Sequence, residues 1–150
     1  MIPSTSLALR NSWPLWDQGQ HFDLGRILDC AVTDTIVPGA VGILGTHHSG
    51  LWECDLGADK LTWSGGVYDI FGLPRGSSIT RETALSQYRE ESRAKLEYLR
   101  AYALRHRRGF TLDVDIRASS SGEHRRVRII AAPVCSGVTP VRLHGLKFVI

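Results

Sequence analysis

The last third of the chain alternates apolar and polar residues with the two-residue period of a half-buried strand. The clearest example is segment 110–117, FTLDVDIR, in which every second residue is apolar. Further strands are predicted over 127–134 and 141–150, with turns between them, and Gly145 interrupts the last alternation as a bulge would. Consecutive strands joined by tight turns predict an antiparallel sheet.

Two shorter strands are predicted near the middle of the chain. Residues 50–55, GLWECD, and 61–63, LTW, both have strand character, and the segment 57–60, GADK, has the composition of a hairpin turn. These strands precede a stretch with helical character. The sequence therefore predicts a hairpin before the helical part of the domain.

Two short helices are expected next. Ser64 is a suitable N-cap for a helix over 67–71, and Gly72 is suited to the left-handed position that ends it. Thr80 is a suitable N-cap for a second helix over about 81–88.

A longer helix is predicted from Ser92 to His106. At 100° per residue, one side of this helix collects the positions expected to face the core. They are Ser92, Leu96, Leu99, Tyr102, Ala103 and His106.

The N-terminal part is expected to lie outside the sheet. Residues 1–21 resemble a tail, although Trp13 and Trp16 are expected to dock on the domain body or on a second copy. Residues 22–49 are predicted to hold an amphipathic helix and a linker. The apolar stripe of that helix covers the back of the sheet or forms a dimer contact, and it consists of Leu24, Ile27, Leu28, Ala31 and Val32.

These elements together predict an α+β domain over 50–150, in which a helical segment crosses one face of an antiparallel sheet. The composition agrees, since 150 residues form one domain and 43% hydrophobic with 22% charged residues is ordinary for a globular protein. The net charge of +3 demands no acidic partner. No apolar run approaches the roughly 20 residues of a membrane span, and no signal peptide is recognised.

The three cysteines are Cys30, Cys54 and Cys135. Because they are widely spaced and form no C-x-x-C pair, they imply neither a zinc ribbon nor a disulfide framework. A cytoplasmic protein is expected. Cys54 and Cys135 are interpreted as small, inert apolar residues.

The stretch LTWSGGVYDIFGLPRG, residues 61–76, raises the possibility of a phosphate cradle. Gly65 and Gly66 are not followed by the lysine and hydroxyl of a phosphate loop. The dinucleotide fingerprint belongs to parallel βαβ units, whereas these strands are antiparallel. Phosphate binding is therefore not expected at this turn.

Four motifs in order along the chain resemble a known family. GLWECDL at Gly50 to Leu56, WS at Trp63-Ser64, FGLP at Phe71 to Pro74 and GEHRRV at Gly122 to Val127 resemble one subgroup of PAS domains. The resemblance covers about residues 50–150. It implies a five-stranded antiparallel sheet in the order 2-1-5-4-3, with helices on one face.

The same resemblance implies a sensor or interaction module of bacterial signal transduction. Such domains are often homodimers formed through a helix before the first strand. They stand alone or form the N-terminal sensor part of a larger regulator, such as a histidine kinase or a diguanylate cyclase. Departures from the pattern occur at 89–93, where REESR keeps only the last Arg of H-P-x-D-R, at Arg126 in place of Trp, and at Val149 in place of the Asp of a terminal D-I-T.

The first functional hypothesis is a sensor or adaptor that acts through protein contacts, homodimerisation or a small ligand held between sheet and helices. A ligand or partner would favour one conformation of the domain, and a downstream effector would respond to that conformation. The candidate pocket residues are Trp52, Trp63, Phe71, Leu99, Ala103, Leu112, Val114, Ile129, Leu146 and Phe148. The elbow between strand 61–63 and the following helix is expected to border that pocket.

Two other classes remain open. A small enzyme of this fold needs a buried acid or base, for which His106 or Glu53 would serve. Nucleic-acid binding would use the basic run of Arg105, Arg107, Arg108, Arg125, Arg126 and Arg128, but no aromatic platform accompanies it, and a solvated face is favoured. Asp113 and Asp115 are expected to face outward.

No cofactor is indicated. His47 and His48 lack a third metal ligand within reach, and His106 is expected to complement the helix dipole rather than bind haem. The N-C-R-F-L-Q-like helix of flavin photoreceptors is missing. The identity of any ligand is left open.

Overall fold

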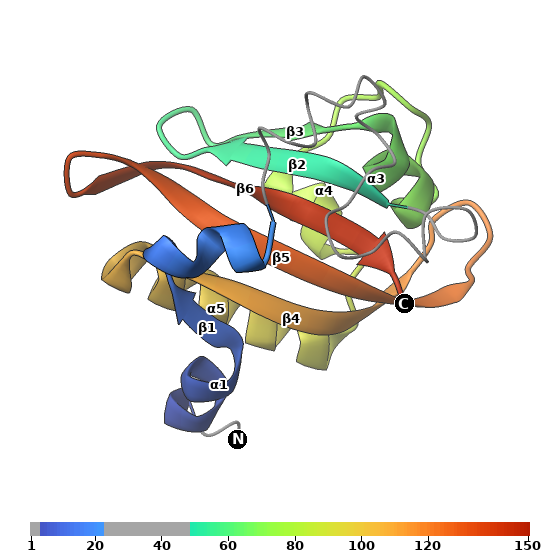
Figure 1. The fold of residues 1–150 in the computed structure, drawn as a ribbon. Helices are drawn as coiled ribbons and strands as arrows, with labels where there is room; N and C mark the ends of the chain where they lie inside the picture. Colours follow the sequence, from blue (N-terminus) through green and yellow to red (C-terminus); the bar gives the residue numbers. More distant parts are fainter. Residues whose placement is uncertain (1–3, 23–48) are drawn as a thin grey trace.

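The sheet has six antiparallel strands in the order β1-β4-β5-β6-β2-β3 (Figure 1). This computed structural model describes residues 4–22 and 49–150, with side chains from residue 7 onward. The strands are β1 Ser12–Pro14, β2 Ser49–Asp55, β3 Lys60–Trp63, β4 Arg108–Arg117, β5 His124–Ser136 and β6 Thr139–Val149. The five strands after residue 49 have the predicted order. The predicted number of strands is wrong, because β1 adds a sixth.

Three helices lie between β3 and β4, as the order of the sequence patterns predicts. They are α3 Gly65–Phe71, α4 Arg81–Leu85 and α5 Glu90–His106, and they pack on one side of the sheet, here called the helix face (Figure 1). The opposite side is called the outer face. In the described part of the chain, no helix is both long enough and apolar enough to cross a membrane.

The main core lies between the helix face and these helices. It takes alternate residues of the strands from β2 to β6, among them Trp52 of β2, Leu112 of β4 and Ile129 of β5, and it takes Leu99 and Ala103 from α5. These side chains are nearly or completely excluded from solvent. Their alternation is what the strand patterns predict.

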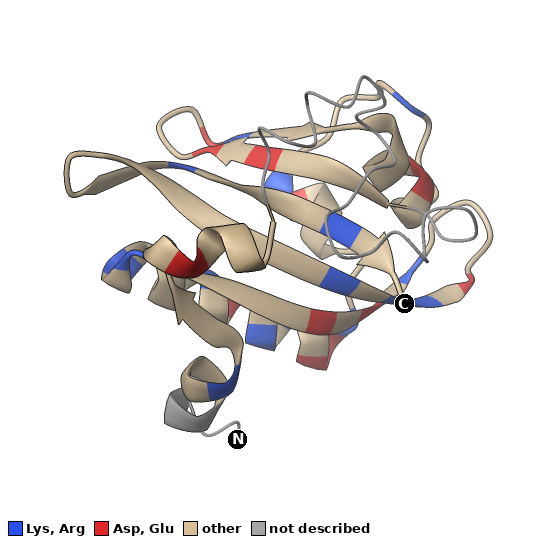
Figure 2. Ribbon diagram, in the orientation of Figure 1, with Lys and Arg blue, Asp and Glu red and all other residues tan. Residues whose placement is uncertain are grey.

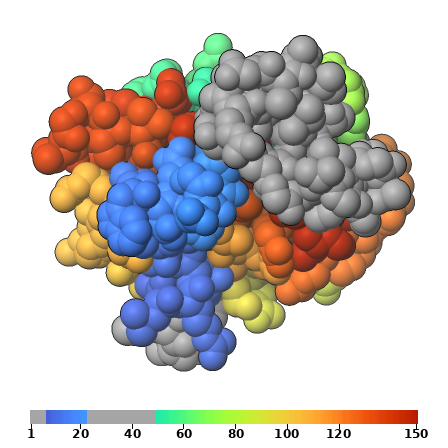
Figure 3. Space-filling view, in the orientation of Figure 1, coloured from blue at the N-terminus to red at the C-terminus, as the bar shows by residue number. Residues whose placement is uncertain are grey.

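The N-terminal segment is an ordered part of the fold and not a tail. It forms α1 Ser4–Asn11, then β1, which pairs with β4, and then the 3₁₀ helix η1 Leu15–Gln20. In Figure 3 this segment, in blue, sits directly on the strands of the sheet. It was not predicted because its short elements carry no sustained period.

A second, smaller core lies on the outer face. Trp13 and Phe22 from the N-terminal segment pack there against strand residues of β5 and β6. The strand residues are Ile130, Ala132, Leu146 and Phe148. The expected docking of Trp13 is therefore observed, whereas Trp16 is 86% exposed.

The helix caps follow the prediction only in part. Thr80 Oγ1 accepts a hydrogen bond from Thr83 N at 3.1 Å, and Gly72 adopts the left-handed conformation with φ 68°. Ser64 occupies the N-cap position of α3, but its hydroxyl instead accepts from Leu51 N at 2.9 Å. Ser92 is not a cap, because α5 begins two residues earlier; its hydroxyl accepts from Asp115 N at 2.9 Å.

The bulge expected at Gly145 is not there. Gly145 pairs in regular register with Ala131 and Trp52, and the register shift lies between Val134 and Cys135. A glycine is required at 145 for a different reason, since an added Cβ would overlap the carbonyl oxygen of Ile130.

Several predictions concern residues 23–48, which lie outside the described residues. They are the dimer-contact stripe of Leu24, Ile27, Leu28, Ala31 and Val32, together with His47 and His48.

Candidate functional site: a caged lysine beneath the helices

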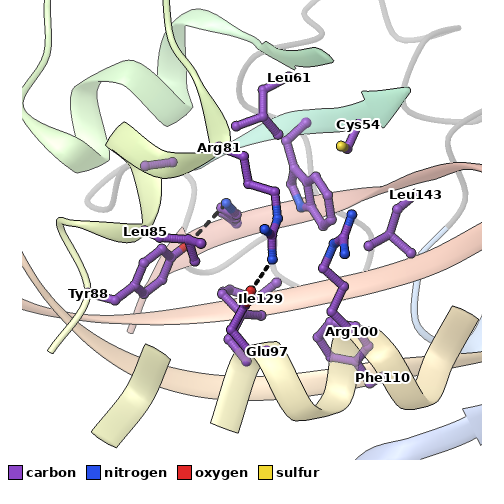
Figure 4. Close-up of a pocket in the computed structure, with 14 residues that line it drawn as sticks. Cys54, Leu61, Arg81, Leu85, Tyr88, Glu97, Arg100, Phe110, Ile129 and Leu143 are labelled. Atoms are coloured by element: carbon purple, nitrogen blue, oxygen red, sulfur yellow. Dashed lines mark hydrogen bonds and ion pairs between the residues drawn. The ribbon is translucent and has the colours of Figure 1, made fainter. Parts of the chain in front are cut away.

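A pocket lies between the helix face of the sheet and the helices α4 and α5 (Figure 4). The cavity volume is about 50 Å³, counted as the space that the centre of a water molecule can occupy. This is room for a few waters. The pocket is lined by Trp52, Cys54, Leu61, Arg81, Ala84, Leu85, Tyr88, Leu96, Glu97, Arg100, Phe110, Ile129, Leu143 and Lys147. Most of this wall is apolar, so the polar members stand out.

Lys147 lies inside a cage of four aromatic rings. Its Nζ is 5.0 Å from the ring centre of Trp52, 5.2 Å from Phe71, 5.5 Å from Trp63 and 5.8 Å from Tyr88. The side chain is only 6% exposed. Each ring face attracts an ammonium, so the cage partly replaces the water that the lysine has lost.

The alternation of β6 places this lysine inside. The side chains of Leu143 and Lys147, on either side of Gly145, point to the helix face, whereas those of His144, Leu146 and Phe148 point to the outer face. Because lysine is charged, its residue type predicts that the Lys147 side chain faces solvent. The alternation of side chains along β6 nevertheless directs it to the helix face. In the structure Gly145 pairs with Trp52, whose side chain faces inward, and this register sets the phase of β6 that also turns Lys147 inward.

Tyr88 is the hydrogen-bond partner of Lys147, whose Nζ donates to the tyrosine hydroxyl over 3.1 Å. Burial raises the pKa of Tyr88, so this residue stays neutral. Burial also lowers the pKa of Lys147 from 10.5 to about 7. The two groups therefore form a pair in which only the lysine changes its charge near neutral pH.

An ion pair between α4 and α5 stands at the same pocket. Arg81 of α4 hydrogen-bonds the carboxylate of Glu97 on α5, and Figure 4 shows the two side chains pointing toward one another. Arg100, one turn further along α5, also points toward the pocket in that view. The polar wall thus carries more positive than negative charge.

The predicted pocket residues divide into three groups. Trp52 and Ile129 line the pocket, and Trp63 and Phe71 complete the cage. Four others are buried in the main core without lining the pocket: Leu99, Ala103, Leu112 and Val114. Leu146 and Phe148 are wrongly predicted, because they lie in the outer-face core.

The elbow between β3 and α3 does border the cage. Trp63 ends β3 and Phe71 ends α3, and their rings stack at 4.8 Å between centroids. Gly65 and Gly66 belong to α3 itself, which begins two residues earlier than predicted. The glycine pair thus forms the first turn of a helix.

The acid-base candidates do not reach the pocket. The prediction that His106 faces inward is wrong, because it is exposed and lies 4.3 Å from the Tyr102 ring at the end of α5. Glu53 alternates with Trp52 and Cys54 and pairs with Arg142 away from the helix face. Among the described residues, no group of three or more His, Cys, Asp or Glu is arranged to hold a metal.

Four of the arginines in the basic run are engaged by the protein, and the first of them, Arg108, donates from Nε to Ser12 Oγ over 3.1 Å. Arg125 donates to two backbone carbonyls of α3, Arg126 contacts Asp115, and Arg128 bonds Asp113 through two nitrogens. Figure 2 shows the positive and negative positions interleaved on the strands. Asp113 and Asp115 face outward as predicted, away from the helix-face core.

No family model and no curated protein matches this chain. The structure does resemble solved ones. The N-terminal domain of a diguanylate cyclase with PAS/PAC sensor, from Marinobacter aquaeolei, aligns with a TM-score of 0.59 and 13% identity over 66% of this chain and 92% of that one. A sensory box histidine kinase/response regulator from Burkholderia thailandensis aligns with a TM-score of 0.59 and 19% identity, over 73% of this chain and 82% of that one.

A third similar structure is an RNA-binding light-oxygen-voltage receptor, with a TM-score of 0.60 and 14% identity. The alignment covers 68% of this chain but 29% of the receptor, so this chain matches one part of a longer protein. At these identities the comparisons concern the fold. The strand order after residue 49, the helices on one face and these structural matches agree with the resemblance seen in the sequence: this chain has the fold of a PAS domain.

Proposed function

We propose that this chain is a signal-sensing PAS domain, which binds a small ligand beside Lys147 and transmits its presence to an effector domain or a partner protein. The observation that carries the proposal is the caged lysine. Burying an ammonium without a carboxylate partner destabilises a protein, and groups with strongly shifted pKa values gather at functional sites. A pocket with apolar walls and a few polar groups is the usual form of a ligand site.

The likeness to sensor structures supports the same conclusion. Two of the similar structures come from a histidine kinase/response regulator and a diguanylate cyclase. By analogy, we propose an effector of that kind as the output, either within a longer chain or as a separate protein. The free thiols of Cys54 and Cys135 suit the reducing cytoplasm as its location.

Two alternative functions lose support from the geometry. The enzyme hypothesis names His106 or Glu53 as the acid or base, and neither of these two residues lies in the pocket. Nucleic-acid binding through the basic run would compete with contacts that Arg125, Arg126 and Arg128 already make.

Native mass spectrometry of freshly purified protein tests the ligand proposal. Ala84 is 5% exposed and lines the pocket, so Ala84→Leu should fill the space and abolish a retained ligand mass. Ala94 is exposed on α5, and Ala94→Leu is the matched control that should retain it. An unliganded wild type that no small molecule stabilises would oppose the proposal.

Homodimerisation is proposed through the predicted N-terminal helix, whose apolar stripe includes Ile27 and Leu28. Removing the N-terminus is a poor test, because Trp13 and Phe22 belong to the outer-face core. The double variant Ile27→Glu and Leu28→Glu leaves those residues in place. Light scattering should give a dimer mass for the wild type and a monomer mass for the variant; equal masses would contradict this contact.

A further inference from the structure

The pocket contains hydrogen-bond donors without matching acceptors. A lysine ammonium has three N–H donors, and one of them is used by the Tyr88 oxygen. Since Tyr88 accepts this bond, its own O–H is a further donor, and no bond from it is formed within residues 4–22 and 49–150. Buried donors of this kind are costly when unsatisfied. They call for an oxygen acceptor supplied from outside.

The charge around these donors favours an anion. Within the described residues, no carboxylate lies within ion-pair distance of Lys147, and Glu97 is already bound to Arg81. The other ionisable groups on the pocket wall are Cys54 of β2 and Arg100 of α5. A site with this surplus of positive charge and low-dielectric walls attracts negative ligands.

The remaining wall favours an apolar tail and limits its length. The apolar residues of this wall include Leu61, Leu85, Leu96, Phe110, Ile129 and Leu143. The cavity volume of about 50 Å³ suits a small ligand that displaces a few waters. A phosphate would bring a second negative charge and no apolar part. A carboxylate with a few carbons matches both parts of the pocket, since its oxygens suit the donors of Lys147 and Tyr88 and its carbons suit the apolar wall.

We propose that the pocket binds a short-chain carboxylate, whose oxygens accept hydrogen bonds from Lys147 Nζ and the Tyr88 hydroxyl. Its carbon chain lies against the leucines of α4 and α5. This inference rests on the proposed ligand-sensing function and adds the chemical class of the ligand. It also assigns Tyr88 as a binding residue, which the sequence patterns did not single out.

The test compares a charged probe with its neutral counterpart on the full chain. Sodium butyrate and butyramide have similar shapes, and calorimetry at pH 6.5 gives both affinities at matched ionic strength. Because a charged acceptor forms a stronger hydrogen bond with an ammonium than a neutral amide does, we expect butyrate to bind at least roughly tenfold more tightly than butyramide. Acetate and hexanoate define the preferred chain length.

Two variants assign the effect to the named groups. Lys147→Met should remove the preference for butyrate, and Tyr88→Phe should weaken butyrate binding by roughly tenfold, the effect of one such hydrogen bond. Lys95→Met on α5 is the control, since Lys95 pairs with Glu91 and does not line the pocket. It should bind both probes as the wild type does.

The possible failures differ. Equal binding of butyrate and butyramide would overturn the carboxylate inference and leave a ligand-binding pocket in place. If neither probe binds and a neutral molecule is retained in native mass spectra, the inference also fails while the sensing proposal stands. If no probe binds and no molecule is retained, both are wrong. The comparison on the wild type requires no variant to fold.

Discussion

The indole of Trp13 lies directly on the backbone of Gly109. A Cβ added to Gly109 would overlap carbons of the ring, so only glycine permits this contact. The ring also stacks on His21 at 4.0 Å between centroids, and its Nε1 donates to Thr111 Oγ1 at 3.2 Å. One tryptophan thus fastens the N-terminal segment to the first residues of β4.

Truncating this tryptophan should destabilise the domain. Trp13 is 7% exposed, and a buried Trp→Ala change costs about 3 kcal/mol or more. Trp13→Ala should therefore lower the free energy of unfolding by about 3 kcal/mol in urea titrations followed by circular dichroism. Trp16 is 86% exposed, so Trp16→Ala should change it by less than about 0.5 kcal/mol. Similar values for the two variants would refute the docking of this segment.

The contact between Trp13 and Gly109 should appear as energetic coupling. Gly109→Ala should cost about 2 kcal/mol through overpacking against the ring. In a Trp13→Ala background the same change should cost clearly less, giving a coupling of about 1 kcal/mol. Gly19→Ala is the control, because no atom lies within 4 Å of its added Cβ. Additive effects at positions 13 and 109 would mean that the two residues do not touch.

The sequence contained enough information for the sheet from β2 to β6 because its strands alternate over many residues. Segment 110–117 shows this, since its apolar positions all enter the core. The N-terminal segment was missed because β1 has three residues, and its place in the sheet depends on contact with Gly109. Such a contact joins residues 96 positions apart, which local patterns do not report.

The site was harder to predict than the fold for a related reason. The sequence predicts three of the four cage rings as pocket residues, because aromatic residues in strands and short helices usually enter the core. Lys147 was missed because a lysine is rarely buried without a partner. A one-residue error in the phase of β6 exchanges Lys147 for Leu146 and Phe148, and residue type favoured that error.

The stability of the domain should rise with pH in a window set by Lys147. Its pKa is about 7 in the folded protein, lowered by burial from an ordinary value of 10.5. Between these values the unfolded chain binds more protons than the folded one, so unfolding becomes less favourable as the pH rises. The slope is at most about 1.4 kcal/mol per pH unit for one group. Urea titrations at pH 7.5, 8.5 and 9.5 measure it.

Lys147→Met is the comparison for this prediction. It should remove the rise and should be more stable than the wild type at pH 7, because a buried charge is replaced by an apolar chain of similar length. The measurements stop below pH 10, because above that pH the ionisation of Tyr88 in the unfolded chain lowers the stability as the pH rises. Its pKa is raised by burial, so its stabilising effect is lost as the unfolded tyrosine ionises. A wild-type slope equal to that of Lys147→Met would show that Lys147 does not titrate in this range.

Arg125 should stabilise the elbow that borders the cage. Its Nη1 donates to Asp69 O at 2.8 Å and to Ile70 O at 2.7 Å, two carbonyls at the C-terminal end of α3, and its side chain is 15% exposed. Cations near helix C-termini bind carbonyls that lack helical partners. Arg125→Met should therefore cost about 2 kcal/mol in urea titrations. Arg126→Met is the neighbouring control and should cost less than about 1 kcal/mol, because Arg126 is 54% exposed and its ion pair is with Asp115 at the surface. If Arg125→Met proved no worse than Arg126→Met, the position of α3 against β5 would have to depend on its apolar side chains alone.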